Sequence, residues 1–117
     1  MKTQQIGNHG EQVAQEYLLQ QGYQILETNY RCKMGEIDII AKDGNTLVFV
    51  EVRSRSSTQY GSPLDTINRT KQQKIRKAAE HFLFTKRKQN AYCRFDVVAI
   101  VWTDDHPQIQ LIKNAFA

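Results

Sequence analysis

The 117-residue sequence lacks any apolar run that approaches the roughly 20 residues a membrane-spanning helix needs. Its first residues, Met1 to Gln5, are polar rather than the apolar centre of a secretion signal, so we expect a cytoplasmic protein. The two cysteines, Cys32 and Cys93, lie far apart without a C-x-x-C pair, so neither a zinc site nor a redox motif is indicated. Repeats and Pro/Gly/Ser-rich linkers are also absent, which predicts one domain over residues 1–117.

Positive charge is concentrated in one part of the sequence. The segment from Arg53 to Arg94 contains eleven Lys and Arg residues but only two acidic residues, a net charge of +9, which leaves the rest of the chain at −5. This distribution is typical of a protein that holds a polyanion against an acidic, metal-binding site. It also fits a solvated basic helix that contacts nothing, and charge alone does not choose between the two.

Two predicted strands near the middle of the chain carry charged side chains within otherwise apolar runs. They cover residues 35–41 and 47–53, and the Asp-Gly turn between them predicts a hairpin. Because side chains alternate along a strand, the charged positions of each run share one face. Buried charges need compensation, and a hard cation such as Mg²⁺ compensates carboxylates well. These positions are Glu36 and Asp38 in the first run and Glu51 and Arg53 in the second.

Helical spacing of apolar residues predicts a helix from Gln5 to Gln20 and a longer one from Leu64 to about Lys88. Glu11 lies at the margin of the first apolar stripe, where it either faces the sheet edge or is favoured by the helix dipole. Lys71 lies near the middle of the second stripe, where it either snorkels to solvent or reaches the carboxylates. The spacing leaves both choices open.

Further strands are predicted at residues 23–30, 94–102 and 108–112. The second of these should lie parallel to a hairpin strand because a long helix precedes it, and the third should lie at an edge. The sequence therefore predicts an α/β fold in the order α-β-β-β-α-β-β, with helices packed on a mixed β-sheet. The segment 53–63 is a basic, hydroxyl-rich loop whose composition suits phosphate contacts as well as ordinary solubility.

This order, with Asp38 on one strand and Glu51-Val52-Arg53 on the next, resembles the core of the PD-(D/E)xK superfamily, the restriction-endonuclease-like fold. The whole chain looks more closely like one branch, the YraN-like bacterial proteins, which are relatives by fold of archaeal Holliday junction resolvases. That branch is known mainly as uncharacterised. The matching stretches are Gly7-x-x-Gly-Glu11, Gly35-Glu-Ile-Asp-Ile-Ile-Ala41, Val48-Phe-Val-Glu-Val-Arg53, Lys71-x-x-Lys74 and Arg94-Phe-Asp-Val-Val-Ala-Ile100.

The resemblance implies that Asp38 and Glu51 bind Mg²⁺ or Mn²⁺, with the Val52 carbonyl and Glu11 as further ligands. Arg53 stands where the superfamily usually has a lysine. Arginine stays protonated, so it can stabilise a phosphate and its developing charge but is a poor proton acceptor. Either the metal lowers the pKa of the attacking water largely alone, or Lys71 supplies the missing ammonium.

Three functions follow from these observations. The first is a Mg²⁺-dependent endonuclease acting on DNA, including branched or otherwise structured DNA. The second is a non-catalytic nucleic-acid-binding protein, which the arginine at position 53 favours. The third is an interaction module whose acids form buried ion pairs. DNA is a more fitting partner than RNA, and a homodimer is left open because junction-cutting relatives by fold are two-fold dimers. The expected catalytic residues are Glu11, Asp38, Glu51, Arg53 and Lys71, and the expected nucleic-acid contacts are Arg53, Arg55, Arg69, Lys71, Lys74 and Lys77.

Overall fold

A computed structural model describes residues 3–56, 67–88, 90–103 and 106–117, with the side chains of residues 3–8 outside the description. Its element order confirms the predicted α/β class and the order α-β-β-β-α-β-β. None of the described helices is both long and apolar enough to cross a lipid bilayer. The elements are α1 (Thr3–Gln20), β1 (Gln24–Cys32), β2 (Gly35–Asp43), β3 (Thr46–Arg55), α2 (Arg69–Thr85), β4 (Tyr92–Trp102) and β5 (Pro107–Phe116).

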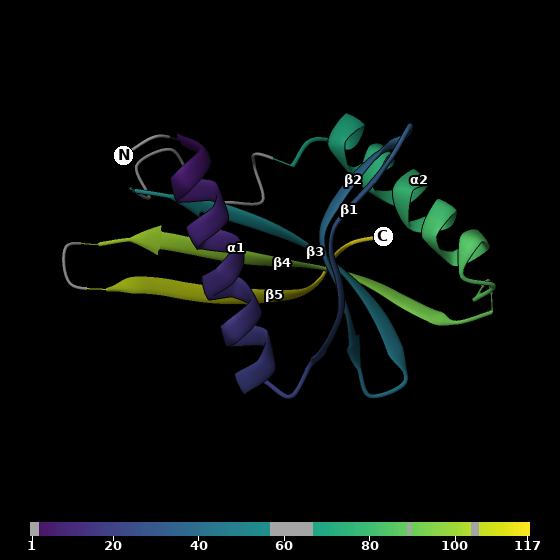
Figure 1. Ribbon diagram of the computed structural model, residues 1–117, viewed down its shortest axis with the longest axis horizontal. Helices are drawn as coiled ribbons and strands as arrows, with labels where there is room; N and C mark the ends of the chain where they lie inside the picture. The colour runs from purple at the N-terminus through teal and green to yellow at the C-terminus, as the bar shows by residue number, and fades with distance from the viewer. Residues whose placement is uncertain (1–2, 57–66, 89, 104–105) are drawn as a thin grey trace.

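The five strands form one mixed sheet in the order β1-β2-β3-β4-β5 (Figure 1). The β2–β3 pair is the predicted hairpin, with Asp43 opposite Thr46 and a turn that Gly44 permits by its positive φ of 61°. After the α2 crossover, β4 lies parallel to β3 over its whole length, as predicted. The remaining neighbours are antiparallel, and β5 forms the predicted edge.

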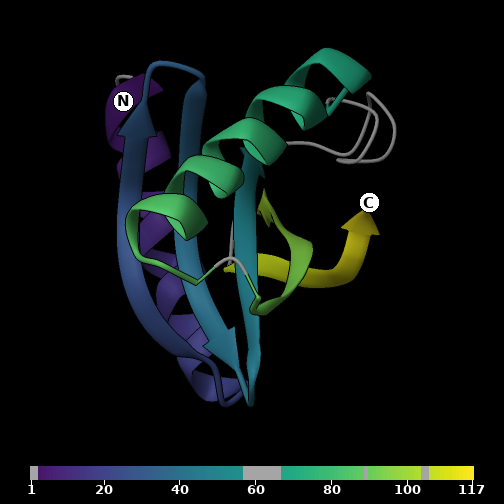
Figure 2. The same cartoon turned by 90° about the vertical axis from the view of Figure 1, so that its right-hand side faces the viewer.

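The two helices cover opposite faces of this sheet. Figure 2 shows α2 crossing the near face while α1 lies behind the strands. Ala14 and Leu18 of α1 pack on one buried cluster, and Ile75 and Phe82 of α2 pack on another. Because β3 and β4 are covered on both faces, their central residues, 47–50 and 97–101, are apolar at consecutive rather than alternate positions.

Three predicted boundaries were wrong. α2 begins at Arg69 rather than Leu64, because Asn68 caps it by accepting a hydrogen bond from the Lys71 amide at 2.9 Å. The predicted loop 53–63 begins later, since β3 continues to Arg55, and residues 57–66 lie outside the described residues. β5 extends to Phe116, four residues beyond the predicted end of the last strand.

Candidate functional site

The candidate site is located where the main-chain pairing of β2 with β3 ends. Ile39 opposite Val50 is the last pair of that ladder. Ile37 packs in the cluster under α2 while Ile39 packs in the cluster under α1, so the regular alternation of faces breaks at Asp38. The Asp38 carboxylate accepts a hydrogen bond from the Val52 amide at 2.8 Å. A side chain therefore replaces the main-chain partner at this point of the sheet.

A pocket of about 280 Å³ opens beside this break. Its lining comes from four elements that are distant in sequence, because α1 and α2 approach the ends of β2 and β3 from opposite faces of the sheet. All of the residues expected to bind metal or act in catalysis line this pocket. They are Glu11 of α1, Asp38 of β2, Glu51, Val52 and Arg53 of β3, and Lys71 of α2, joined by Glu36 and Ser54.

Glu51 is the acidic side chain in this pocket that is most enclosed, with only 8% of it exposed. Its Oε2 lies 3.5 Å from the Lys71 Nζ and 4.0 Å from the Arg53 Nη2, yet it accepts no hydrogen bond within the described part of the chain. Burial, followed by a hydrogen bond with Asp38 and the charge of that residue, raises the pKa of Glu51 to about 8 even though the charges of Lys71 and Arg53 lower it. The raised pKa favours the protonated, uncharged form of Glu51 at neutral pH.

Glu11 reaches the pocket because α1 approaches β3 closely. A Cβ atom on Gly10 would lie 3.1 Å from the Ser54 Cβ, so glycine permits this approach. Burial raises the pKa of Glu11, the nearby charge of Asp38 raises it further, and a hydrogen bond with Asn29 lowers it. Asn29 has a positive φ of 54° in β1, which the sequence pattern did not reveal.

The donor atoms in the pocket fit a hard divalent cation. Mg²⁺ usually binds through one or two carboxylates and completes its shell with water and substrate phosphate, and Asp38, Glu51 and the Val52 carbonyl provide such a set. The buried, unbonded Oε2 of Glu51 is an atom that a cation would compensate. No three His, Cys, Asp or Glu side chains among the described residues converge to hold an ion by themselves, so the ligand roles of Glu11, Asp38, Glu51 and Val52 stay predictions.

The remaining basic residues expected to contact nucleic acid lie outside the pocket. Arg55 ends β3 and Arg69 begins α2, two residues before Lys71. Lys74 and Lys77 are exposed along α2. Their contacts with nucleic acid stay predictions.

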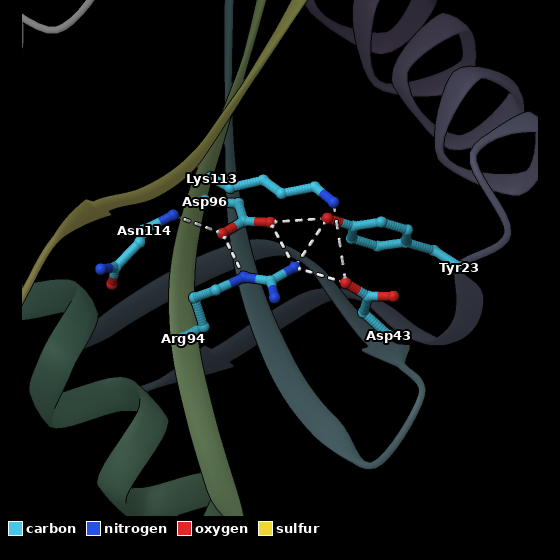
Figure 3. Close-up of polar contacts among 6 residues, drawn as sticks. All are labelled: Tyr23, Asp43, Arg94, Asp96, Lys113 and Asn114. Carbon is cyan, nitrogen blue, oxygen red and sulfur yellow. Dashed lines mark hydrogen bonds and ion pairs between the residues drawn. The ribbon is translucent and has the colours of Figure 1, made fainter.

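The structure also contains a buried polar network at the opposite, hairpin-turn end of the sheet, which the sequence did not reveal (Figure 3). Asp96 is fully buried and accepts hydrogen bonds from the Tyr23 hydroxyl, from Arg94 and from the Asn114 amide, the first and last at 2.9 Å. Arg94 also donates to Asp43 at 2.9 Å, and hydrogen bonding to Asp96 raises the pKa of Arg94. Each of these charges is compensated, so the network ties the connection between α1 and β1 to β2, β4 and β5.

Comparison with known proteins identifies the family. The model of the uncharacterised protein family UPF0102 matches residues 10–100. A UPF0102 protein of Caldicellulosiruptor saccharolyticus is 47% identical over 99% of this chain and 100% of its own length. Others from Clostridium tetani and Syntrophus aciditrophicus are 49% and 52% identical, over 97% and 94% of this chain and 95% and 87% of their own. The chain therefore belongs to the UPF0102 family, the YraN-like group that its motifs resemble.

Proposed function

We propose that this chain is a divalent-metal-dependent endonuclease that hydrolyses phosphodiester bonds in DNA, including branched or otherwise structured DNA. The observation that carries the proposal is the contact between Asp38 and Glu51 in a pocket that also contains the cations of Arg53 and Lys71. Two adjacent acids beside two cations match the needs of a metal ion and the phosphate that it activates.

Three residues of the pocket would bind the metal ion. Asp38, Glu51 and the Val52 carbonyl would hold Mg²⁺ or Mn²⁺, which when bound polarises the scissile phosphate and lowers the pKa of the attacking water. A bound metal ion would favour the ionised form of Glu51, because its charge would oppose the burial that raises the pKa of this carboxyl group.

Arg53 and Lys71 neutralise the charge that develops on the phosphate. The guanidinium of Arg53 cannot accept a proton, so its role is electrostatic. The Lys71 ammonium, brought in by α2, occupies the same pocket and is the available amine in place of the lysine that the resemblance implies at position 53.

The test combines metal binding with cleavage. Calorimetric titration of Mn²⁺ and Mg²⁺ into the wild type should show one site, and Asp38→Ala should lose it. The wild type should cleave at least one of a duplex, a fork and a four-way junction, and Asp38→Ala should be slower by roughly a hundredfold or more. Glu16→Ala, which removes an exposed acid of α1 outside the pocket, is the matched control and should behave as wild type. Absence of wild-type cleavage, or equal cleavage by Asp38→Ala, would reject the proposal.

A second function is favoured by one observation. Glu51 already lies within ion-pair distance of Lys71 and Arg53, so its charge has partners without any metal. A non-catalytic nucleic-acid-binding protein would use the same basic surface, and its binding would weaken steeply with salt. Such binding should persist in chelator and in Glu51→Ala, and its loss on addition of chelator would contradict this alternative.

A further inference from the structure

A second pocket, of about 350 Å³, lies at the far end of α2 from the candidate active site. We call it the cationic pocket, because its lining includes Lys42, Arg87 and Lys88 and no acidic residue. None of these three side chains forms an ion pair with a described carboxylate. Carboxamide groups complete the polar lining, and they are those of Gln24, Asn45 and Asn90. Unpaired cations and amide donors around a hollow are suited to an anion.

The backbone of Arg87 gives a second, independent reason to regard this pocket as a site. Its φ is 55°, in the left-handed region that favours glycine. Arg87 occupies the first position after the cap of α2, and the end is closed by hydrogen bonds from the Lys88 amide to Leu83 at 2.7 Å and from the Arg87 amide to Phe84 at 3.2 Å. Glycine is the usual residue in this motif. Arg87 therefore adopts a backbone conformation that glycine would adopt at lower cost, while its side chain lines the pocket.

The cationic pocket and the candidate active site lie at the two ends of the same helix. Lys71, near the start of α2, lines the first, and Arg87 and Lys88, just after its end, line the second. Leu47 of the cationic pocket also packs in the cluster under α2, so the pocket opens on the face that α2 crosses (Figure 2). The 17 residues of α2 separate the pockets by about 25 Å, at about 1.5 Å per residue.

This separation points to an extended polyanion rather than a small anion. Successive phosphates of a B-form strand are about 3.4 Å apart along the axis, so 25 Å corresponds to roughly seven or eight base pairs. Lys74 and Lys77 are exposed on α2 between the two pockets and continue the positive charge along this path. A duplex that lies along α2 is therefore long enough to reach both pockets, with phosphates of its two strands facing the protein.

We propose that the cationic pocket binds a backbone phosphate of the same duplex whose scissile phosphate lies in the candidate active site. This inference rests on the proposed function and specifies its substrate. The chain should need about eight base pairs of duplex on one side of the cut, and Arg87 should act as a distant anchor rather than a catalytic residue.

The experiment measures binding without cleavage. Fluorescence anisotropy in chelator compares a 16-bp duplex with a 5-bp stem–loop, which is too short to reach both pockets, over a range of KCl concentrations. Arg87→Gly should bind the long duplex at least about fivefold more weakly and reduce the slope of log affinity against log salt by about one. It should leave stem–loop binding unchanged, and its melting temperature should equal or exceed that of the wild type because glycine suits the backbone.

Lys86→Ala is the matched control, because it removes a positive charge at the same helix end from a residue that does not line the pocket. It should change affinity for the long duplex by less than about twofold. Equal losses of affinity in Arg87→Gly and Lys86→Ala would overturn the proposal that Arg87 is an anchor. Equal losses of affinity for the duplex and the stem–loop in Arg87→Gly would also overturn it. Binding of inorganic phosphate or a free mononucleotide as tight as that of the duplex would also overturn it, in favour of a small-molecule site.

Cleavage assays in Mg²⁺ or Mn²⁺ separate this inference from the proposed function. If the wild type cleaves DNA while Arg87→Gly binds as Lys86→Ala does, the anchor is wrong and the nuclease proposal stands. If Arg87→Gly loses duplex binding while the wild type cleaves nothing, the anchor stands on binding alone and the nuclease proposal fails.

Discussion

The protonation of Glu51 should make the stability of this protein depend on pH and on metal. Burial is the largest cause of its raised pKa, and the hydrogen bond and charge of Asp38 act in the same direction. Below the ordinary value of 4.5 the group is protonated in both folded and unfolded chains, and its stabilising contribution is complete. As pH rises towards 8, the unfolded chain releases the proton first, so stability falls and the contribution is lost once the folded group also ionises.

The size of this effect follows from the two pKa values. The gap between 4.5 and about 8 corresponds to roughly 5 kcal/mol, since each pKa unit is worth about 1.4 kcal/mol. Glu51→Gln removes the titration while preserving the shape of the side chain and a donor for Asp38. In chelator, the wild type should therefore lose stability between pH 5 and pH 9. In Glu51→Gln, position 51 does not titrate and contributes no such loss. At pH 9 the variant should melt about 10–20 °C above the wild type.

Circular-dichroism melting curves at each pH, with and without Mn²⁺, measure this difference. Mn²⁺ should restore the wild type at high pH by binding the ionised pair, and should leave Glu51→Gln nearly unchanged. Glu16→Gln, the same substitution at an exposed acid of α1, is the control and should follow the wild type. Parallel pH profiles for the wild type and Glu51→Gln would refute the reasoning, because they would show that Glu51 titrates as an ordinary exposed acid.

Three further predictions test other parts of the structure. Arg53→Lys should change the cleavage rate by less than about threefold in a fluorescent-substrate assay, because Lys71 already supplies an amine and position 53 needs only a positive charge. A gain of about tenfold or more would show that proton transfer at position 53 limits the reaction. Gly10→Ala should lower the free energy of unfolding in urea by about 1 kcal/mol. The added Cβ would lie 3.1 Å from the Ser54 Cβ, and this steric cost outweighs the gain in helix propensity. A stabilised variant would contradict the close packing. Asp96→Asn should lower the free energy of unfolding by about 3 kcal/mol, because the buried ion pair with Arg94 is lost and Asp43 is left as the carboxylate partner of Arg94. Cleavage per folded molecule should stay unchanged, and a selective loss of cleavage would place the network in the site.

The hairpin and the parallel strand could be predicted from sequence because their signals are local. An Asp-Gly turn between two apolar runs fixes the register of β2 and β3, and that register brings Asp38 and Glu51 to neighbouring positions. A long helix before β4 leaves a parallel crossover as the natural connection. The clustering of the acids at one end of the hairpin therefore follows from counting residues from the turn.

The remaining features depend on contacts between distant residues. The apolar pattern of β5 stops at Ile112, but the strand continues past a bulge because the Asp96 carboxylate accepts the Asn114 amide at 2.9 Å. Asn29 gives no sequence signal for its positive φ, which accompanies its hydrogen bond with Glu11. In the same way, the cationic pocket joins Lys42 to residues that follow α2, and the fold alone brings them together.

The substitution of arginine at the expected lysine position is intelligible from the way α2 approaches the sheet. Where no neighbouring element supplies an amine to such a site, a lysine on the strand must supply it. Here Lys71 reaches the same Glu51 oxygen from the helix, at 3.5 Å, while Arg53 lies 4.0 Å from it. The strand position is then relieved of any proton transfer and needs only a permanent positive charge, which arginine supplies. On this account Lys71 of α2 supplies the amine for proton transfer and Arg53 of β3 supplies a permanent positive charge. A single lysine on the strand would otherwise perform both roles.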